Sequence, residues 1–144
     1  MVRHVASIAE IVEDVDAAVR FYRDVLGFEV KRDAGAPYAL VHVPGILHFG
    51  IWERTAAAES VYGDPAQAHR VPLGFSVGFE VDAVRAAVER LQAGGANVLH
   101  PPRQEPWGQT TARLLSPGGA VLEVAETPWA RTVVSDVAAA GESA

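Results

Sequence analysis

The feature of this sequence that most constrains its fold is an internal repeat. The segment Ser7–Val19, SIAEIVEDVDAAV, lies directly over Ser76–Val88, SVGFEVDAVRAAV, 69 residues further along the chain. In both copies an apolar, strand-like run meets acidic residues and continues as a helical pattern. Two copies are too few for a solenoid, which needs about three or more repeats. The repeat therefore predicts a duplicated module related by a pseudo-twofold axis.

The first half of the chain has the pattern of a β-α-β-β-β unit. Val5–Val12 is rich in Val and Ile, which predicts a strand, and Asp14 is a good cap for a helix that stops at Gly27. Three further strands are expected, over Phe28–Arg32, Tyr38–Val43 and Ile46–Trp52.

The second half repeats this order. Leu73–Val81 predicts a strand and Asp82–Gln92 a helix, and Pro101–Gly108 reads as a loop between strands. The strands expected after the helix are Asn97–His100, Thr110–Leu115 and Ala120–Ala125. The linker Thr55–Pro72 has room for a short helix.

These elements predict one domain over residues 1–131, with its two βαβββ repeats at about 4–54 and 73–127. Residues 132–144 contain mainly Ala, Ser, Gly and Val, and we expect a flexible tail there.

Composition excludes several classes of function. The chain contains no Cys, which excludes a disulfide scaffold, a Cys-ligated metal site and a thiol nucleophile. A formal net charge of −6 and the lack of a basic run argue against a nucleic-acid partner. No apolar run approaches the roughly 18 residues of a membrane helix, and acidic residues interrupt the N-terminal region. We expect a cytoplasmic protein without a membrane partner.

Two segments resemble a known family. Phe21–Phe28, FYRDVLGF, after Asp14–Ala18, and Pro106–Val124, PWGQTTARLLSPGGAVLEV, resemble signature segments of the vicinal oxygen chelate superfamily. That superfamily includes glyoxalase I, extradiol dioxygenases, fosfomycin-resistance enzymes and bleomycin-binding resistance proteins. The resemblance spans about residues 4–127 and implies an α+β fold, in which two βαβββ modules form curved sheets around a cavity. It also implies a homodimer, but a fold shared so widely does not specify a function.

The resemblance also implies where a metal would bind. Enzymes of the superfamily hold a divalent ion through one residue from each of four strands, usually His on the first strand of each module and Glu or His on the last. Ser7 and Ser76 stand at the two His positions, and Glu123 stands at the position of the last strand. Placing Leu47–Phe49 over Leu122–Val124 makes His48 the counterpart of Glu123.

A hydroxyl is a poor ligand for a divalent ion beside imidazole or carboxylate. We therefore predict that the protein needs no cofactor. The alternative is a divalent metal ion held by His48 and Glu123, with help from His4 or another residue.

Strand alternation brings polar residues to the expected cavity. Thr111 and Arg113 share one strand face, and Glu123 lies on the corresponding face of the next strand, beyond the turn Ser116–Gly119. A cross-strand Arg113–Glu123 pair is the simplest interpretation, and a ligand contact is the other.

Aromatic residues are expected at the cavity mouth. Trp107 lies in a loop that Pro106 and Gly108 leave free to adapt, and Trp52, Tyr38 and Phe49 are the other aromatics nearby. The candidates for ligand binding are therefore Ser7, His48, Trp52, Ser76, Trp107, Thr111, Arg113 and Glu123.

Other polar residues receive different interpretations. Strict alternation places Glu10 on the helix-facing side of its strand, so either a bulge or another register would be needed to turn it outward. Three histidines, His42, His69 and His100, are expected at the surface or in turns. The match of Gly74–Gly78 to the nucleophile-elbow motif is taken as chance, because its Ser lies within an uninterrupted strand.

Three functions fit these observations. The first is a dimeric, metal-free protein that binds a hydrophobic or aromatic small molecule such as an antibiotic, resembling the bleomycin-resistance branch. The second is a divalent-metal-dependent lyase, isomerase or dioxygenase of the same superfamily. The third is an enzyme without metal in which Glu123 is a general base.

Overall fold

The computed structural model describes residues 1–129, so the expected tail over 132–144 lies outside the described residues. The first module contains β1 (Val2–Val12), α1 (Val15–Arg20) with a continuing π-helical turn η1 (Phe21–Val25), β2 (Glu29–Lys31), β3 (Tyr38–His42) and β4 (Phe49–Glu53). The second contains β5 (Gly74–Val81), α3 (Val84–Ala93), β6 (Asn97–Gln104), β7 (Thr110–Leu115) and β8 (Val121–Glu126). The predicted α+β fold with two βαβββ modules is confirmed.

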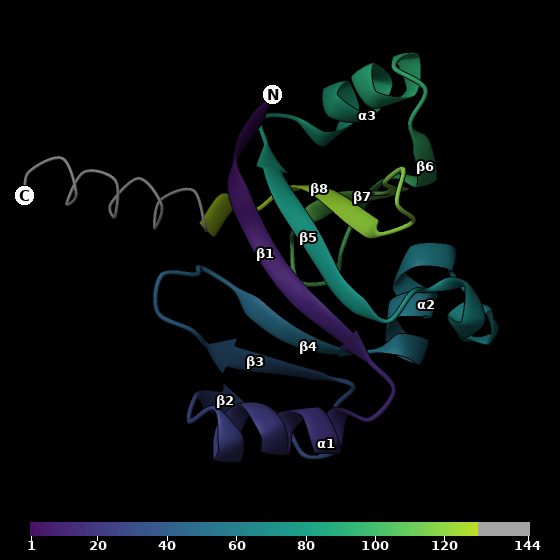
Figure 1. The fold of residues 1–144 in the computed structure, drawn as a ribbon. Coiled ribbons are helices and arrows are strands. Elements are labelled where there is room, and N and C mark those ends of the chain that lie inside the picture. The colour runs from purple at the N-terminus through teal and green to yellow at the C-terminus, as the bar shows by residue number, and fades with distance from the viewer. Residues whose placement is uncertain (130–144) are drawn as a thin grey trace, which may run out of the picture.

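The eight strands of residues 1–129 belong to one curved, unclosed sheet with the order β2-β3-β4-β1-β5-β8-β7-β6 (Figure 1). The two modules meet where β1 and β5 pair antiparallel at the centre. In that ladder Ser7 pairs with Gly78, Ile8 with Val77, and Ala9 with Ser76. Since Ser7 and Ser76 are equivalent in the repeat, as are Ile8 and Val77, the pseudo-twofold axis passes between Ile8 and Val77.

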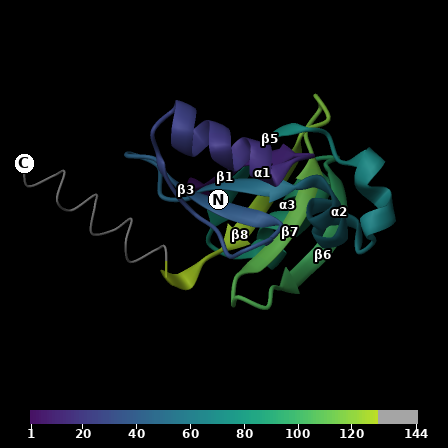
Figure 2. The ribbon, with the colours of Figure 1, turned by 90° about the horizontal axis from the view of Figure 1, so that it is seen from below.

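Each helix covers its own module and buries equivalent residues. Val15 and Val19 of α1 pack against β3 and β4, and Val84 and Val88 of α3 pack against β5, β7 and β8. These helix residues are also 69 positions apart, so the sequence repeat is a repeat of core contacts. The two helices lie at opposite ends of the molecule, so the view in Figure 2 looks onto α1. Within the described residues no helix is long and apolar enough to cross a membrane.

The linker between the modules is helical. It contains α2 (Arg54–Tyr62) and the 3₁₀ segment η2 (Pro65–Arg70). Ala57 and Ala58 of α2 pack against Ile11 of β1 and Val71, and all four are buried. The linker helix is thus a packed part of the domain.

Several strand boundaries differ from the prediction, among them that of β1, which begins at Val2 rather than Val5, and two of the differences bear on the site. The expected loop over Pro101–Gly108 is wrong in its first half, because β6 continues through Pro101 and Pro102 to Gln104 with two register shifts. β6 is an edge strand, where proline does not break a ladder on both sides. In the first module β4 begins at Phe49 rather than Ile46, since residues 43–46 form a turn closed by a bond from Ile46 N to Val43 O (3.2 Å), and irregular backbone follows to residue 48.

Glu10 follows strict strand alternation, so neither a bulge nor a changed register is needed there. It pairs with Phe75 in the ladder, and its Oε1 accepts a 2.5 Å hydrogen bond from the Tyr22 hydroxyl of η1. Burial, followed by this bond to Glu10, raises the pKa of Tyr22. The carboxylate therefore has a structural partner on the helix side of the sheet.

Candidate functional site

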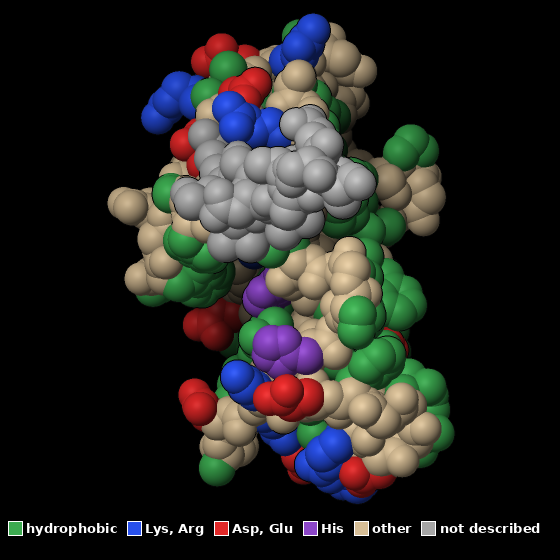
Figure 3. Space-filling view, turned by 90° about the vertical axis from the view of Figure 1, so that its left-hand side faces the viewer, with side chains coloured by type: hydrophobic (Ala, Val, Ile, Leu, Met, Phe, Trp, Pro, Cys, Tyr) green, Lys and Arg blue, Asp and Glu red, His purple; other side chains and the backbone are tan. Residues whose placement is uncertain are grey.

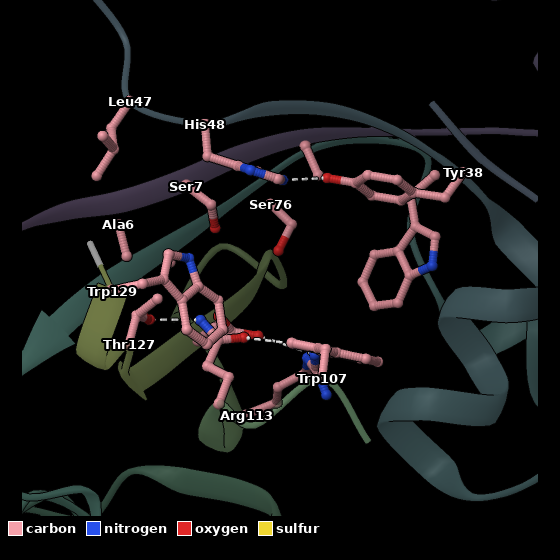
Figure 4. A pocket seen from close by; sticks show the side chains of 15 residues that line it. Ala6, Ser7, Tyr38, Leu47, His48, Ser76, Trp107, Arg113, Thr127 and Trp129 are labelled. Carbon is pink, nitrogen blue, oxygen red and sulfur yellow. Dashed lines mark hydrogen bonds and ion pairs between the residues drawn. The ribbon is translucent and has the colours of Figure 1, made fainter. Parts of the chain in front are cut away.

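The concave face of the sheet encloses a cavity of about 580 Å³. Seven of the eight candidate residues line it: Ser7, His48, Trp52, Ser76, Trp107, Arg113 and Glu123. The eighth, Thr111, lies behind the wall, fully buried, and its hydroxyl donates a 2.8 Å hydrogen bond to Glu105. Tyr38, Gln109, Thr127 and Trp129 also line the cavity (Figure 4).

A line of polar positions crosses the sheet beneath this cavity. The ladder pairs His100 with Arg113, Arg113 with Glu123, Glu123 with Gly78, and Gly78 with Ser7. We call these five positions the polar row.

His48 stands beside the Ser7 end of the polar row, because its carbonyl accepts a 3.0 Å bond from Ile8 N. The row therefore brings side chains of both modules to one line of the cavity floor.

The pseudo-twofold axis generates a second row, and its chemistry is different. Ladder pairs join Leu40 to Gly50, Gly50 to Ala9, and Ala9 to Ser76. Because Ala9 is equivalent to Gly78, its neighbour Gly50 is equivalent to Glu123. The expected equivalence of His48 and Glu123 is therefore wrong by two residues.

Tyr38 fills the space left by Gly50. A Cβ atom at Gly50 would lie 1.9 Å from the Tyr38 hydroxyl oxygen, so the phenol occupies the position of a side chain there. The same oxygen lies 2.5 Å from His48 Nε2 (Figure 4). Burial raises the pKa of Tyr38, with a further contribution from the Glu123 charge, and burial lowers the pKa of His48. Both directions favour a neutral hydrogen-bonded pair.

The residues at the four family positions do not fit a divalent ion. They are Ser7, Gly50, Ser76 and Glu123, which together offer one carboxylate. The Ser76 hydroxyl donates to Val121 O at 2.7 Å, and Glu123 is already paired with a guanidinium. Among the described residues no group of three His, Asp or Glu side chains has a metal-binding arrangement. Such a donor set is too poor for zinc or for a six-coordinate ion.

Arg113 is the centre of the polar contacts in the second module. Its Nη2 donates to Glu123 Oε2 at 2.8 Å, and its Nη1 donates to Ser60 Oγ of α2 at 2.8 Å. Its guanidinium carbon lies 5.4 Å from the centre of the Trp52 ring. Arg113 and Glu123 are only 3% and 9% exposed, so the predicted cross-strand pair is a buried one. Burial raises the pKa of Glu123, although the Arg113 charge opposes this.

Glu105 supports Arg113 from behind the cavity wall. Its Oε1 accepts bonds from Arg103 (2.9 Å) and Thr111 (2.8 Å) and lies 3.4 Å from Arg113 Nη1. Burial opposes ionisation of Glu105, but the bonds from Arg103 and Thr111 and the Arg113 charge hold its pKa below the ordinary value. The carboxylate therefore compensates two guanidinium groups.

His100, expected at the surface or in a turn, lies in β6 with part of its side chain exposed. It is half-buried, its Nδ1 lies 2.8 Å from Pro101 O, and its Nε2 lies 3.3 Å from Arg113 Nη1. Burial is the main cause of the lowered pKa of His100. The bond to the Pro101 carbonyl raises this pKa, and the charges of Arg113 and Arg103 lower it further. A neutral ring with its proton on Nδ1 suits both contacts.

Trp107 lines the cavity from a loop that hydrogen bonds brace. Its loop is closed by bonds from Glu105 N to Gln109 O (2.7 Å) and from Gly108 N to Glu105 O (2.9 Å). The indole N–H donates to Gln109 Oε1 at 3.1 Å, and the Gln109 amide donates to Thr127 Oγ1 at 2.7 Å. These bonds restrain the loop in this conformation, and its freedom to adapt on binding stays a prediction.

Trp129, which follows β8, is a second exposed indole beside the cavity. Trp107 and Trp129 are 55% and 53% exposed. The described segment after β8 and the loop between β3 and β4 lie on the left of Figure 1, and Figure 3 views that side. There, most charged side chains gather at the two ends, with hydrophobic and His side chains between them.

Sequence reasoning missed Glu105, Ser60 and Trp129 as site residues. Arg103 and Glu105, two residues apart, would share a face if β6 had been recognised beyond Pro102. No sequence signal places Ser60 beside Arg113, because that contact depends on how the linker helix packs. Two further histidines stay outside the site: His42 and His69 are exposed. His4 Nε2 is buried without a hydrogen-bond partner among the described residues.

Comparison with known proteins gives one family. The family model described as "Glyoxalase/Bleomycin resistance protein/Dioxygenase superfamily" matches residues 4–124. A search of curated proteins finds no significant match.

Solved structures share the fold at low identity. The methylmalonyl-CoA epimerase of Mycobacterium tuberculosis is 21% identical, with a TM-score of 0.61, and the match covers 91% of this chain and 93% of that one. A Streptomyces coelicolor methylmalonyl-CoA epimerase variant in complex with 2-nitronate-propionyl-CoA is 18% identical, with a TM-score of 0.59 and coverage of 89% and 99%. A superfamily member from Vibrio splendidus is 17% identical, with a TM-score of 0.58 and coverage of 88% and 100%. At these identities the likeness concerns the fold alone.

The buried charges generate a prediction on stability. Glu105→Gln should lower the free energy of unfolding at pH 7 by about 2–3 kcal/mol, because it removes the carboxylate that pairs with Arg103 and leaves Arg113 with Glu123 as its one acidic partner. The folded pKa of Glu105 lies below the ordinary 4.5, so this contribution is present at neutral pH and is lost as the pH falls below 4.5. The difference between wild type and variant in urea titrations should therefore shrink on acidification. Exposed Glu89→Gln is the control, and equal effects of both substitutions would contradict the prediction.

Proposed function

The chain belongs to the glyoxalase/bleomycin resistance protein/dioxygenase superfamily, and from this premise we propose that it binds an aromatic small molecule without a metal. The observation that carries the proposal is the composition of the cavity wall. Three indoles, those of Trp52, Trp107 and Trp129, surround a space of about 580 Å³. That volume lies within the range of sites for drug-sized ligands, which are mostly apolar with a few polar groups.

The two indoles at the mouth favour a flat apolar ligand. Each is more than half exposed, so a ligand that covers them removes apolar surface from water. Stacking on an aromatic ring adds roughly 0.5–1.5 kcal/mol beyond that burial. Because Gln109 and the loop bonds hold Trp107 in place, little ordering cost remains for binding.

Metal independence is supported by the donors of the cavity floor. The proposed site has hydroxyls at Ser7 and Ser76 and a glycine at position 50, where a metalloenzyme of the family would use stronger ligands. Glu123 bonds to Arg113, and His48 Nε2 is in contact with Tyr38. In the metal-dependent lyase, isomerase or dioxygenase alternative, a divalent ion would compete with these contacts for His48 and Glu123.

A metal-free proton-transfer enzyme is the second candidate. The raised pKa of Glu123, caused first by burial, is the observation that favours it, since a general base works best with a pKa near the working pH. A binding protein would release its ligand unchanged. Hydrogen exchange from solvent into a bound ligand, lost in Glu123→Gln, would instead favour the enzyme.

The first prediction of this proposal concerns metal content. Protein purified without chelator should contain well under one divalent ion per chain by elemental analysis. Adding Mg²⁺, Mn²⁺, Zn²⁺ or Ni²⁺ should leave its melting temperature unchanged. One ion per chain, lost on Glu123→Ala or His48→Ala, would refute metal independence.

The second prediction concerns Trp107. In a fluorescence screen of aromatic compounds, ligands should change the tryptophan emission, and Trp107→Ala should weaken their binding about tenfold without unfolding the protein. Leu73→Ala, at a 52% exposed position outside the cavity lining, is the matched control. Binders that tolerate the loss of Trp107, Arg113 and Glu123 alike would refute the cavity as their site.

The third prediction concerns assembly. Exposed apolar side chains near α1 and β5 support the proposed homodimer, among them Phe21, Val25, Leu26 and Phe75. Light scattering at micromolar concentration should give twice the mass of the chain, and Phe75→Glu should reduce it to that of one chain. A monomer in both proteins would refute this part of the proposal.

A cytoplasmic location remains a prediction from the sequence.

A further inference from the structure

Gly78 is the one position of the polar row without a side chain, and its backbone does not require glycine. Its φ angle is not among the positive values that the structure has at eight other glycines. Glycine inside a strand costs roughly 0.5–1 kcal/mol relative to alanine, and it often marks close approach of a ligand or another backbone. The absence of a side chain at Gly78 therefore calls for an explanation in terms of space.

That space is a notch between two oxygens. A Cβ atom at Gly78 would lie 2.6 Å from Ser7 Oγ and 3.1 Å from Glu123 Oε1, too close for carbon in the first case and tight in the second. The two oxygens, from β1 and β8, thus converge on the space above the glycine. All three residues line the cavity, so the notch opens into it.

The chemistry of the notch favours a hydrogen-bond donor. Glu123 uses Oε2 to accept from Arg113, and it presents Oε1 to the notch. An ionised carboxylate oxygen only accepts, and a serine hydroxyl can also accept. Arg113 already balances the charge of Glu123, and a second cation there would lie close to the guanidinium. A neutral donor therefore fits better than an ammonium group.

The second row, which passes through Gly50, lacks such a notch. Ala9 stands at the equivalent of Gly78, Gly50 at the equivalent of Glu123, and the hydroxyl of Ser76 donates to Val121 O. A ligand with one donor group would therefore meet one complementary position on the cavity floor. The asymmetry defines which way the ligand points.

We infer that the notch at Gly78 is a subsite for one neutral donor, such as a hydroxyl group, carried on an aromatic ligand. This inference rests on the proposed function and adds the polar class of the ligand to it. Ser7 and Glu123 recognise the donor, while the indoles at the mouth contact the ring.

A matched pair of probes tests the subsite. Equilibrium dialysis of 2-naphthol and 2-methoxynaphthalene compares a ring with a donor and the same ring with the donor capped by methyl. Wild type should bind 2-naphthol at least about tenfold more tightly, since leaving the carboxylate oxygen without its donor is costly. Gly78→Ala fills the notch and should abolish this preference.

Two further variants keep the test decisive. Gly118→Ala, in the β7–β8 turn with no atom nearer than 3.8 Å, should retain the full preference. Ser7→Ala removes one of the two oxygens without adding bulk and should reduce the preference about threefold, so it decides the matter if Gly78→Ala does not fold. Melting curves report folding of each variant.

The outcomes separate the two proposals. Equal binding of both probes by wild type, or an unchanged preference in Gly78→Ala and Ser7→Ala, overturns the subsite but leaves aromatic binding intact. Binding of neither probe overturns both the subsite and the proposed aromatic ligand.

Discussion

The antiparallel pairing of β1 with β5 is the contact on which the rest of the molecule depends. Each module alone supplies four strands and one helix, which cover only half of a concave surface. Pairing about the axis between Ile8 and Val77 joins the halves into one sheet and brings the two inner faces together. The cavity, its floor and its walls all follow from this register, because a slip of one residue would turn every floor side chain to the other face.

The two modules have the same fold but different side chains at equivalent positions of the cavity floor. In the second module the row through Glu123 carries a carboxylate and a guanidinium on neighbouring strands, whereas the equivalent positions in the first module are Gly50 and Leu40, which carry no polar side chain. A symmetric dimer of identical modules would have to repeat each substitution on both sides of the axis. Because the two modules are one chain, a phenol from Tyr38 can replace a side chain in one half while the other half keeps its ion pair.

Much of this arrangement follows from the sequence, and the failures have local physical causes. Strand alternation placed Arg113 and Glu123 on one surface, as the structure has them, because β7 and β8 pair without a register shift and keep a period of two. The position of Ser7 came from the family resemblance. The counterpart of Glu123 was misplaced because the turn before β4 is longer than the strand pattern suggested. His100 lies in β6 and Glu105 directly follows it. Both were missed because the register shifts and the two prolines of β6 obscure the strand pattern in the sequence. The contact of Ser60 with Arg113 joins residues 53 positions apart, and only packing of the linker helix creates it.

The prolines of β6 also affect how the edge of the sheet can interact with other chains. Open sheets expose two edges whose free backbone groups can recruit strands from other chains and seed aggregation. Here one edge is β6, with Pro101 and Pro102, and the other is β2, three residues long with charged Glu29 and Lys31 at its ends. Neither edge offers a long, regular ladder. Strands of other chains are therefore disfavoured from adding to either edge and forming a continuous intermolecular sheet. The sheet can stay open around its cavity without serving as a template for fibrils.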